Sequence, residues 1–476
     1  MQLTGSIALA KGLPDRERAT MARLLDVWQQ HHTKNAVKKR YYEGHIPLRE
    51  VNLGLALPKG MAGLEIGCAW GEKTVDVLAS RSMFDGFVGR NGEASGTMTR
   101  IMTANRLIAE YMKACRDELK YGCTFATLTA DRETGCRIRF HSPETAAAEW
   151  NGEEGRIGDG FAVIDVVQDP KTEEQKPSVI HLHTDDAVWV LRRGRDDADW
   201  SAEYHPQAMG RPLMEPLVWN ATSGKPFGRS RLKEPIRRLI QGYVRTVANA
   251  TIGLEFSTAP QKYLLGVTDD QYDALVNDKF RAYVGSLLAA TGNPETGEKP
   301  TYGQLSQGTI EPHVQMMRML ATQFSAATGL TVTDVGVVND ANPASSEAIL
   351  AQSQTLILMA EQLNAGNGDS LNTIALMAQA IARNVPPAQL TDEERDVVAH
   401  FKNPAMPSVS AMADAALKIA SMRRAFSQTD VFLEMTGFDQ ADIRRIKAQE
   451  SRARGLGLLD EIELEEDIGT DDVIEA

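Results

Sequence analysis

The sequence predicts an α+β protein made of several parts, and three observations support this. Residues 229–256 and 309–328 have the apolar spacing of long helices, and about fifty turn-rich residues separate them. Between residues 123 and 219 the chain shows short alternating apolar runs divided by turn-forming groups, which predicts an antiparallel sheet. Helical periodicity returns beyond residue 344. This order favours an elongated, multi-part building block over a compact enzyme with a pocket.

The first third of the chain is expected to be mainly helical. Residues 13–32 place several apolar side chains on one face, and the basic run that follows closes on Tyr41-Tyr42-Glu43-Gly44, which suits a helix end. Residues 75–84 are apolar with a helical period. A longer helix is predicted over 97–121, and Gly122 is expected to stop it.

The predicted sheet consists of at least five strands. They are residues 125–129, 137–140, 161–167, 179–183 and 187–191. His181 and His183 alternate within one of these runs, so both point to the same face. Two histidines are too few for a metal site, and we interpret them as a surface pair.

The segment 229–256 carries one clean apolar stripe. Its members are Leu232, Ile236, Leu239, Ile240, Tyr243, Val244 and Val247. Ser230 is predicted to cap this helix, and Pro235 to kink its first turn. Arg237, Arg238 and Arg245 lie off the stripe, where they meet either DNA, acidic neighbours or solvent.

The segment 309–328 carries a second stripe and leads into a loop. The stripe comprises Met317, Leu320, Ala321 and Phe324, and Gly329 is expected to end it. Residues 330–342 are predicted to be a loop. Ser345 or Ser346 then caps a third helix, which is expected to break at 364–368 and to resume over 369–383. Three short helices are predicted near the C-terminus, at residues 409–424, 429–435 and 440–454.

The charge of the chain is unevenly distributed. The net charge is -13, and residues 460–476 hold nine acidic and no basic side chains. Such a tail is expected to be disordered and solvated. The remainder is mildly acidic and lacks the positive charge with which proteins grip phosphates tightly. No window approaches the roughly 18 apolar residues of a membrane helix, and no signal peptide is evident, so a soluble, cytoplasmic-type chain is expected.

No motif of enzyme or metal chemistry is convincing. The four cysteines form no C-x-x-C pair, which predicts free thiols and no metal site. There is no P-loop, G-x-S-x-G or H-E-x-x-H motif. The segment from Glu65 to Gly71 looks like the first motif of class I methyltransferases, which use S-adenosylmethionine. Ala69 replaces its middle glycine and no acidic residue follows at the expected distance, so a methyltransferase is kept only as an alternative.

Five short motifs, in order, resemble the portal proteins of long-tailed bacteriophages, especially those of phages that infect actinobacteria. They are Tyr41-Tyr42-Glu43-Gly44, Val75-Asp76-Val77-Leu78-Ala79, Pro226-Phe227-Gly228-Arg229-Ser230-Arg231-Leu232, Ala259-Pro260-Gln261-Lys262-Tyr263 and Asn342-Pro343-Ala344-Ser345-Ser346-Glu347-Ala348-Ile349. The resemblance covers most of residues 14–455. It departs at Gly60 to Glu72, where the family usually has a plainer approach to the helix.

This resemblance implies the domain organisation of a portal subunit. Its parts would be a mixed α/β wing at 1–228 and 344–404, stem helices at 229–256 and 309–328, a small α/β clip at 257–308, a tunnel loop at 329–343, an α-helical crown at 405–459 and a disordered acidic tail at 460–476. The expected function is a homo-oligomeric ring, typically of twelve subunits, at one capsid vertex of the virion. Double-stranded DNA would pass through its channel non-specifically during packaging and ejection.

The resemblance also implies partners and channel residues. The partners would be a terminase that supplies ATP-driven force, a head-completion or adaptor protein, and the major capsid and scaffold proteins, without membrane, cofactor or catalytic residue. Channel candidates on the tunnel loop are Val335, Val337, Val338, Asn339, Asp340 and Asn342. A packed connection without DNA contact is the alternative for this loop, and a minor capsid or scaffold protein is the alternative for the whole chain.

Overall fold

The computed structural model describes residues 3–46, 66–89, 95–168, 173–194, 199–258, 262–265, 297, 301–304, 309–336, 346–405, 409–438 and 442–454. The chain divides into two compact units. Unit 1 comprises Met1–Asn35, Asp76–Ser230 and Glu347–Ala476, and unit 2 comprises Ala36–Val75 and Arg231–Ser346. The predicted mixture of helices and antiparallel sheets is confirmed, but the sequence does not predict that residues 36–75 belong with the two long helices.

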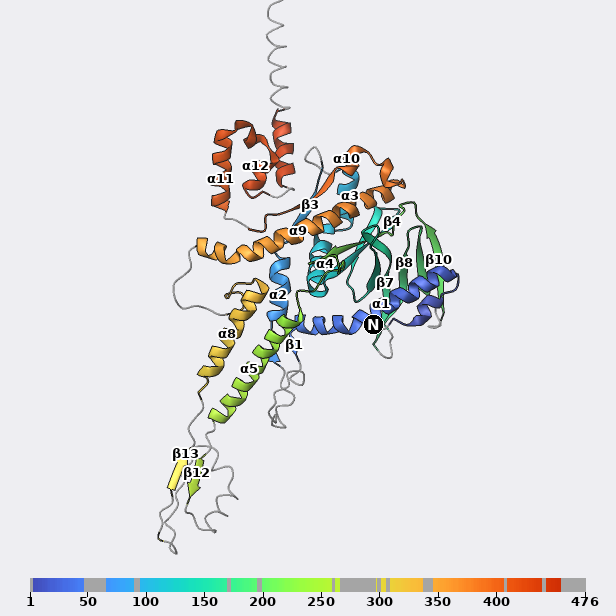
Figure 1. The fold of residues 1–476 in the computed structure, drawn as a ribbon. Helices are drawn as coiled ribbons and strands as arrows, with labels where there is room; N and C mark the ends of the chain where they lie inside the picture. Colours follow the sequence, from blue (N-terminus) through green and yellow to red (C-terminus); the bar gives the residue numbers. More distant parts are fainter. Residues whose placement is uncertain are drawn as a thin grey trace, which may run out of the picture. The chain divides into compact units, whose positions relative to one another are not determined.

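Unit 1 is built around two antiparallel sheets (Figure 1). The five-stranded sheet has the order β10-β9-β8-β7-β6, with β6 at Ala146–Asn151, β7 at Arg156–Gln168, β8 at Gln175–His183, β9 at Ala187–Arg193 and β10 at Trp200–Pro206. The three-stranded sheet has the order β11-β4-β5, with β4 at Cys123–Asp131, β5 at Gly135–His141 and β11 at Met214–Val218. All five predicted strands are present.

Each face of the five-stranded sheet packs against a different partner. The 3-10 helix η1 (Gly5–Leu9) and the N-terminal part of α1 (Asp15–Tyr42) cover one face, where Met21, Leu24 and Trp28 join strand residues such as Ile180 and Leu182. On the other face, strand residues of β6 and β7 share a second core with side chains of β4 and β11. The helix predicted over 13–32 continues through the basic run, and it ends at Tyr42, where Tyr41-Tyr42-Glu43-Gly44 predicts a helix end.

The prediction that His181 and His183 form a surface pair is wrong. His183 is fully buried, and neither of its ring nitrogens has a hydrogen-bond partner among the described residues. Both histidines lie on the face of β8 opposite Ile180 and Leu182, towards His141 of the other sheet. Burial lowers the pKa of His141 and His181 to about 4, and that of His183 well below its usual value. The sequence shows the alternation of the strand but not the sheet that covers its second face.

The predicted helix 97–121 is interrupted. It consists of α3 (Gly96–Ala104) and α4 (Leu107–Tyr121), and Arg106 between them adopts a left-handed conformation with φ 49°. The Asn105 amide donates to the Cys136 carbonyl at 2.8 Å and accepts from the Ile138 N–H at 2.9 Å. This side chain therefore pairs with the backbone of β5, which explains why the helix stops there. Gly122 ends α4 as predicted, with φ 114°.

The predicted break of the third helix at 364–368 is also wrong, because α9 runs without interruption over Ser346–Arg383. Asn367 inside it is fully buried, and its amide donates to Glu118 Oε2 at 2.8 Å and to the Tyr111 hydroxyl at 3.0 Å. Helix propensity disfavours glycine and asparagine by under about 1 kcal/mol each, and buried hydrogen bonds to α4 outweigh that cost.

The remaining elements of unit 1 are short. β3 (Phe84–Gly89) pairs with β14 (Val397–Phe401). The helix predicted over 75–84 corresponds to α2 (Trp70–Ala79), which ends before residue 84. η4 (Pro387–Gln389) and α10 (Asp392–Arg395) connect α9 to β14. The predicted C-terminal helices appear as α11 (Val409–Met422), α12 (Asp430–Met435) and residues 442–454, with η5 (Arg424–Gln428) between the first two.

Three predictions about chemistry can be compared with the described part of the chain. All four cysteines are buried and free of disulfides, as expected. No group of three or more metal-ligating side chains occurs within the described ranges. Among the helices that the structure describes, none is long and apolar enough to cross a membrane.

Candidate functional site: the paired helices of unit 2

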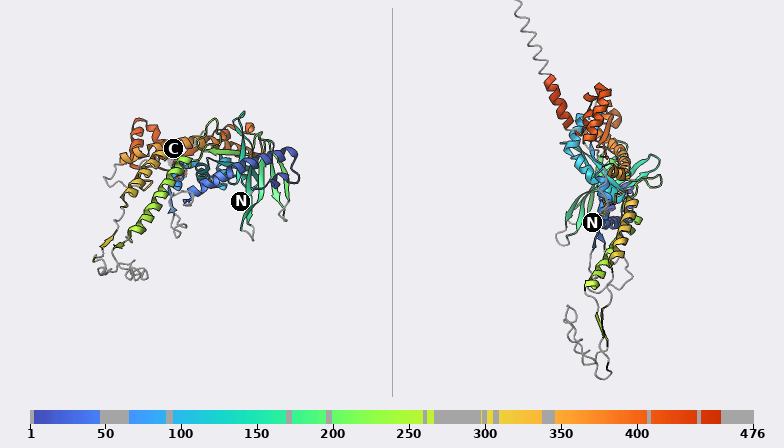
Figure 2. Two further views of the ribbon diagram at one scale, coloured as in Figure 1. Left: turned by 60° about the horizontal axis from the view of Figure 1, so that its bottom comes forward. Right: turned by 90° about the vertical axis from the view of Figure 1, so that its left-hand side faces the viewer.

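Unit 2 is organised by two long helices that pack side by side (Figures 1 and 2). They are α5 (Glu234–Thr258) and α8 (Glu311–Thr328). The chain leaves α5 through β12 (Lys262–Leu265) and returns through β13 (Thr301–Gln304), and these two strands pair antiparallel. β1 (His45–Ile46) and β2 (Ile66–Gly67) form a second antiparallel pair. Both segments predicted as long helices are therefore helical and adjacent.

All residues of the predicted apolar stripes are buried or partly buried. On α5, Ile236, Ile240, Val244 and Ala248 are buried, and on α8, Leu320, Ala321 and Phe324 are buried. The helices approach closely at Gly242, where an added Cβ would lie 3.3 Å from Leu320 Cδ2. A larger side chain there would force the helices apart. Gly329 ends α8 with φ 74°, as predicted.

Trp70 at the start of α2 joins both helices. Its ring centroid lies 4.3 Å from that of Tyr243 and 4.6 Å from that of Phe324. An added Cβ on the neighbouring Gly71 would collide with the Tyr41 carbonyl oxygen. This glycine therefore allows two backbones to approach, which is a packing role. β2 in front of it pairs antiparallel with β1, whereas the methyltransferase motif requires a strand of a parallel sheet.

Arg231 joins the middle of α2 to the C-terminus of α8 from inside unit 2. The side chain is only 7% exposed. Its Nε donates to the Thr74 carbonyl in α2 at 2.6 Å, and its Nη2 donates to the Thr328 carbonyl at the C-terminus of α8 at 2.7 Å. Burial lowers the pKa of Arg231 to about 10, so it remains charged at neutral pH. A cation suits the negative end of a helix dipole. The patterns in the sequence do not predict this role for Arg231.

The caps predicted for α5 differ from those observed. Ser230 does not cap the helix, because α5 begins at Glu234 and the Ser230 hydroxyl donates to the Lys120 carbonyl at 2.6 Å within unit 1. Pro235 lies in the first turn, where proline is tolerated because its missing N–H has no partner there in any helix.

The three arginines predicted for the stem lie in different surroundings. The guanidinium carbon of Arg237 lies 5.8 Å from the centre of the Tyr41 ring. Arg238 pairs with Glu234 at 3.1 Å, one helical turn before it. Arg245 lies on the exposed face of α5. The structure thus brings Arg237 to an aromatic ring and Arg238 to a carboxylate, and does not gather the three into one basic cluster.

The loop after α8 starts as a compact turn. The Thr331 N–H and hydroxyl donate to Asp334 Oδ2 at 2.9 and 2.8 Å. Leu330 and Val335 are buried, at 3% and 8% exposure. The burial of Val335 agrees with the alternative interpretation, in which this loop is a packed connection without DNA contact. The other channel candidates lie outside the described residues; they are Val337, Val338, Asn339, Asp340 and Asn342. Most of the predicted clip and the whole acidic tail also lie outside the described residues.

Part of the surface of the paired helices is apolar. Met316 and Met319 on α8 are 41% and 46% exposed, and Leu254 on α5 is 45% exposed. Leu320, which follows Met319 in the sequence, is buried against α5. Met316 lies one turn before Leu320 and Met319 lies to one side of it, so the exposed methionines border the surface that packs on α5.

The comparisons with known proteins give limited information. No family model matches the chain, and no curated protein matches it. The structure is similar to a chain from the neck of a native GTA particle computed with C12 symmetry, with a TM-score of 0.41, 11% sequence identity and coverage of 74% of this chain and 84% of that chain. It is also similar to a chain from the neck of an empty GTA particle computed with C6 symmetry, with a TM-score of 0.42, 12% identity and coverage of 79% and 93%. TM-scores this low carry no argument about function, so only the residues of this chain can support one.

Proposed function

We propose that this chain is a bacteriophage portal protein, a subunit of a ring that forms the DNA channel at one capsid vertex. The observation that carries the proposal is the arrangement of unit 2. Two long helices run out and back, and a strand pair connects them beyond their ends. These segments are the ones that the ordered sequence motifs assign to the stem and the clip. The chain path over these helices and strands supports the proposal.

The exposed apolar surface of α8 supports assembly. Met316 and Met319 are exposed on a long helix whose Leu320 is already buried against α5. A contact between this surface and a different surface of the next copy is head-to-tail, and such contacts close into rings when the rotation between neighbours allows it. By the resemblance, the ring would typically contain twelve copies.

The charges of the paired helices support a channel that DNA can slide through. Arg238 is neutralised by Glu234, and Arg237 lies against an aromatic ring. The two helices together carry four arginines and three glutamates, and such a small excess of positive charge favours weak affinity for phosphates. A conduit needs weak binding of this kind, since tight binding would slow translocation. We propose that a separate terminase supplies the force and that this chain hydrolyses nothing itself.

The remaining roles depend on the proposed position in the virion. The clip would contact a head-completion or adaptor protein, and the wing would contact major capsid and scaffold proteins. The chain would be assembled in the host cytoplasm and retained at the capsid vertex.

Electron microscopy and native mass spectrometry of the purified chain test this function. We expect closed rings with a central channel and a mass that is an integral multiple, close to twelve, of 52.1 kDa. A population of monomers and dimers at micromolar concentration contradicts the proposal. Open or irregular assemblies without a channel would favour a minor capsid or scaffold protein. Saturable binding of S-adenosylmethionine would favour the methyltransferase alternative instead.

A further inference from the structure

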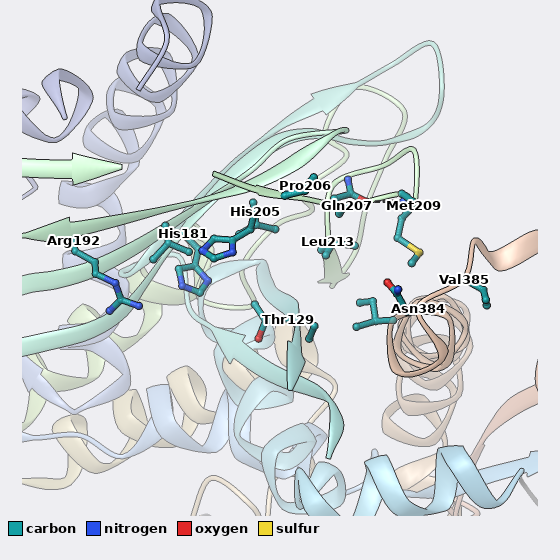
Figure 3. Close-up of a pocket in the computed structure, with 15 residues that line it drawn as sticks. Thr129, His181, Arg192, His205, Pro206, Gln207, Met209, Leu213, Asn384 and Val385 are labelled. Carbon is teal, nitrogen blue, oxygen red and sulfur yellow. Dashed lines mark hydrogen bonds between the residues drawn. The ribbon is translucent and has the colours of Figure 1, made fainter. Parts of the chain in front are cut away.

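Unit 1 contains a cavity between its two sheets and the end of α9. Its volume is about 370 Å³, within the range of roughly 300–1,000 Å³ that is typical of small-molecule sites. Strands β4, β8, β9 and β10, the segment that follows β10, and the last turn of α9 contribute to its walls. Figure 3 shows His181 and His205 in its middle, Arg192 towards one end, and Asn384 and Val385 towards the other.

The titratable side chains that line this cavity are all of basic residue types. They are Arg192, His181 and His205, and no aspartate or glutamate is among the lining residues. His181 Nδ1 is buried and has no hydrogen-bond partner among the described residues. A buried polar atom without a partner costs free energy, unless a ligand supplies the missing hydrogen bond. The nearest carboxylate to His205 is that of Glu203, whose Oε1 lies 3.4 Å from His205 Nε2 outside the lining.

The rest of the wall is mainly apolar. Val188 and Val190 of β9, Leu213, and Ile381 and Val385 at the end of α9 line the cavity. The amide group of Gln207 already donates hydrogen bonds to protein atoms, namely the Thr184 and Arg211 carbonyls at 3.2 and 3.0 Å. The site thus combines an apolar body with a cluster of cationic and imidazole groups. This combination fits a molecule that has one anionic end and one apolar end.

We propose that this cavity binds a small organic carboxylate, whose anionic head contacts His181, His205 and Arg192 and whose apolar chain packs on Val190, Leu213 and Ile381. This ligand site lies in unit 1 and is independent of the proposed ring and channel. Binding of the carboxylate involves no covalent step.

The groups that face His181 determine how binding depends on pH. Arg139 of β5, Arg192 of β9 and His205 of β10 all disfavour its protonation, as does burial, and the pKa of His181 is about 4 in the empty site. The buried His141 and His183 are close neighbours. A bound carboxylate favours the imidazolium form, so the pKa of His181 rises in the complex. Binding therefore takes up protons, and affinity increases as the pH falls towards the pKa of His181.

Calorimetry on the intact wild-type chain tests the proposal with hexanoate as the probe, and with 1-hexanol and acetate as matched controls. Hexanol has the apolar chain without the charge, and acetate has the charge without the chain. We expect hexanoate to bind more tightly than either control by about tenfold or more, because one good charged contact corresponds to about a factor of ten. We expect hexanoate to bind more tightly at pH 5.5 than at pH 7.5, with measurable proton uptake.

A pair of variants assigns the binding to the cavity. Arg192→Gln removes a lining cation, whereas Arg193→Gln makes the same change at the next residue of β9, which does not line the cavity. We expect hexanoate affinity to fall about tenfold in the first variant and to stay at the wild-type value in the second. Equal binding of hexanol and hexanoate by the wild-type chain, no hexanoate binding at millimolar concentration at either pH, or equal loss in both variants would overturn the proposal. The wild-type comparison stands even if a variant does not fold.

Discussion

Arg231 Nη2 donates a hydrogen bond of 2.7 Å to the carbonyl oxygen of Thr328, which joins the segment in front of α5 to the last turn of α8. The N-terminus of one long helix is thereby tied to the C-terminus of the other. Because the second bond of the same guanidinium reaches Thr74 of α2, one buried side chain sets the relative position of three helices of unit 2.

Arg231→Met should destabilise unit 2. The variant leaves the carbonyls of Thr74 and Thr328 without their donor, and an unsatisfied buried polar group costs about 1–3 kcal/mol. We expect a lower midpoint of thermal unfolding by circular dichroism. Arg229→Met is the matched control, because Arg229 is exposed and close in sequence, and its midpoint should equal that of the wild type. An unchanged midpoint for Arg231→Met would show that the contact does not stabilise the helix pair.

Glu118 should make the stability of unit 1 depend on pH. Burial raises the pKa of Glu118 to about 8 from 4.5, so the folded chain holds a proton that the unfolded chain releases between these values. Its stabilising contribution is therefore fully present below pH 4.5 and is lost as the pH rises towards 8, with a slope of roughly 1.4 kcal/mol per pH unit. Glu118→Gln should flatten this dependence in urea unfolding measured from pH 5 to pH 8.

Glu110→Gln is the control for this experiment, because Glu110 lies on the same helix but is partly solvated beside Lys113. Its pH dependence should match that of the wild type. If Glu118→Gln and the wild type show parallel curves, the Glu118 carboxyl does not remain protonated in the folded chain.

Two charges on the exposed face of α8 should prevent ring formation. Met316→Glu together with Met319→Glu places carboxylates on an apolar surface that the proposed assembly buries, and unpaired buried charges are strongly unfavourable. We expect native mass spectrometry to show monomers with a normal circular dichroism spectrum. Gln29→Glu with Gln30→Glu adds the same charge at polar exposed positions of α1, and should still form rings. If the methionine variant still forms rings, the contact between subunits lies elsewhere.

Positive charge on the predicted tunnel loop should slow DNA packaging. Val338→Arg with Asn339→Arg adds two groups that attract phosphates, and the attraction weakens with salt. In a packaging assay with purified terminase, translocation should slow more at low than at high salt. Wild-type rates at every salt concentration would mean that the loop does not face DNA. These positions lie outside the described residues, so the prediction rests on the sequence.

Removal of the acidic tail should leave the assembly unchanged. Residues 460–476 carry nine acidic side chains and few apolar ones, so they offer little surface to a subunit contact. A chain that ends at Leu459 should form rings of the same symmetry by electron microscopy. Failure of this truncated chain to assemble, while the full chain does so, would assign the tail a structural role.

The sequence by itself determined the elements whose pattern is local. The stripes of α5 and α8 and the alternation of β4, β5, β7, β8 and β9 appear where periodicity predicts them, because burial on one side imposes a repeat of the apolar residues. The end of α4 at Gly122 and of α8 at Gly329 was also predictable, since a left-handed residue at these points favours glycine.

Only the tertiary structure decided what lies opposite each element. Asn105 stops a helix because the edge of β5 is beside it, and Asn367 continues one because Glu118 and Tyr111 accept its hydrogen bonds. His183 is buried because a second sheet covers β8, and Arg231 is buried where α2 and the C-terminus of α8 meet. Each outcome depends on partners far away in the chain, whose positions no local pattern of apolar and polar residues records.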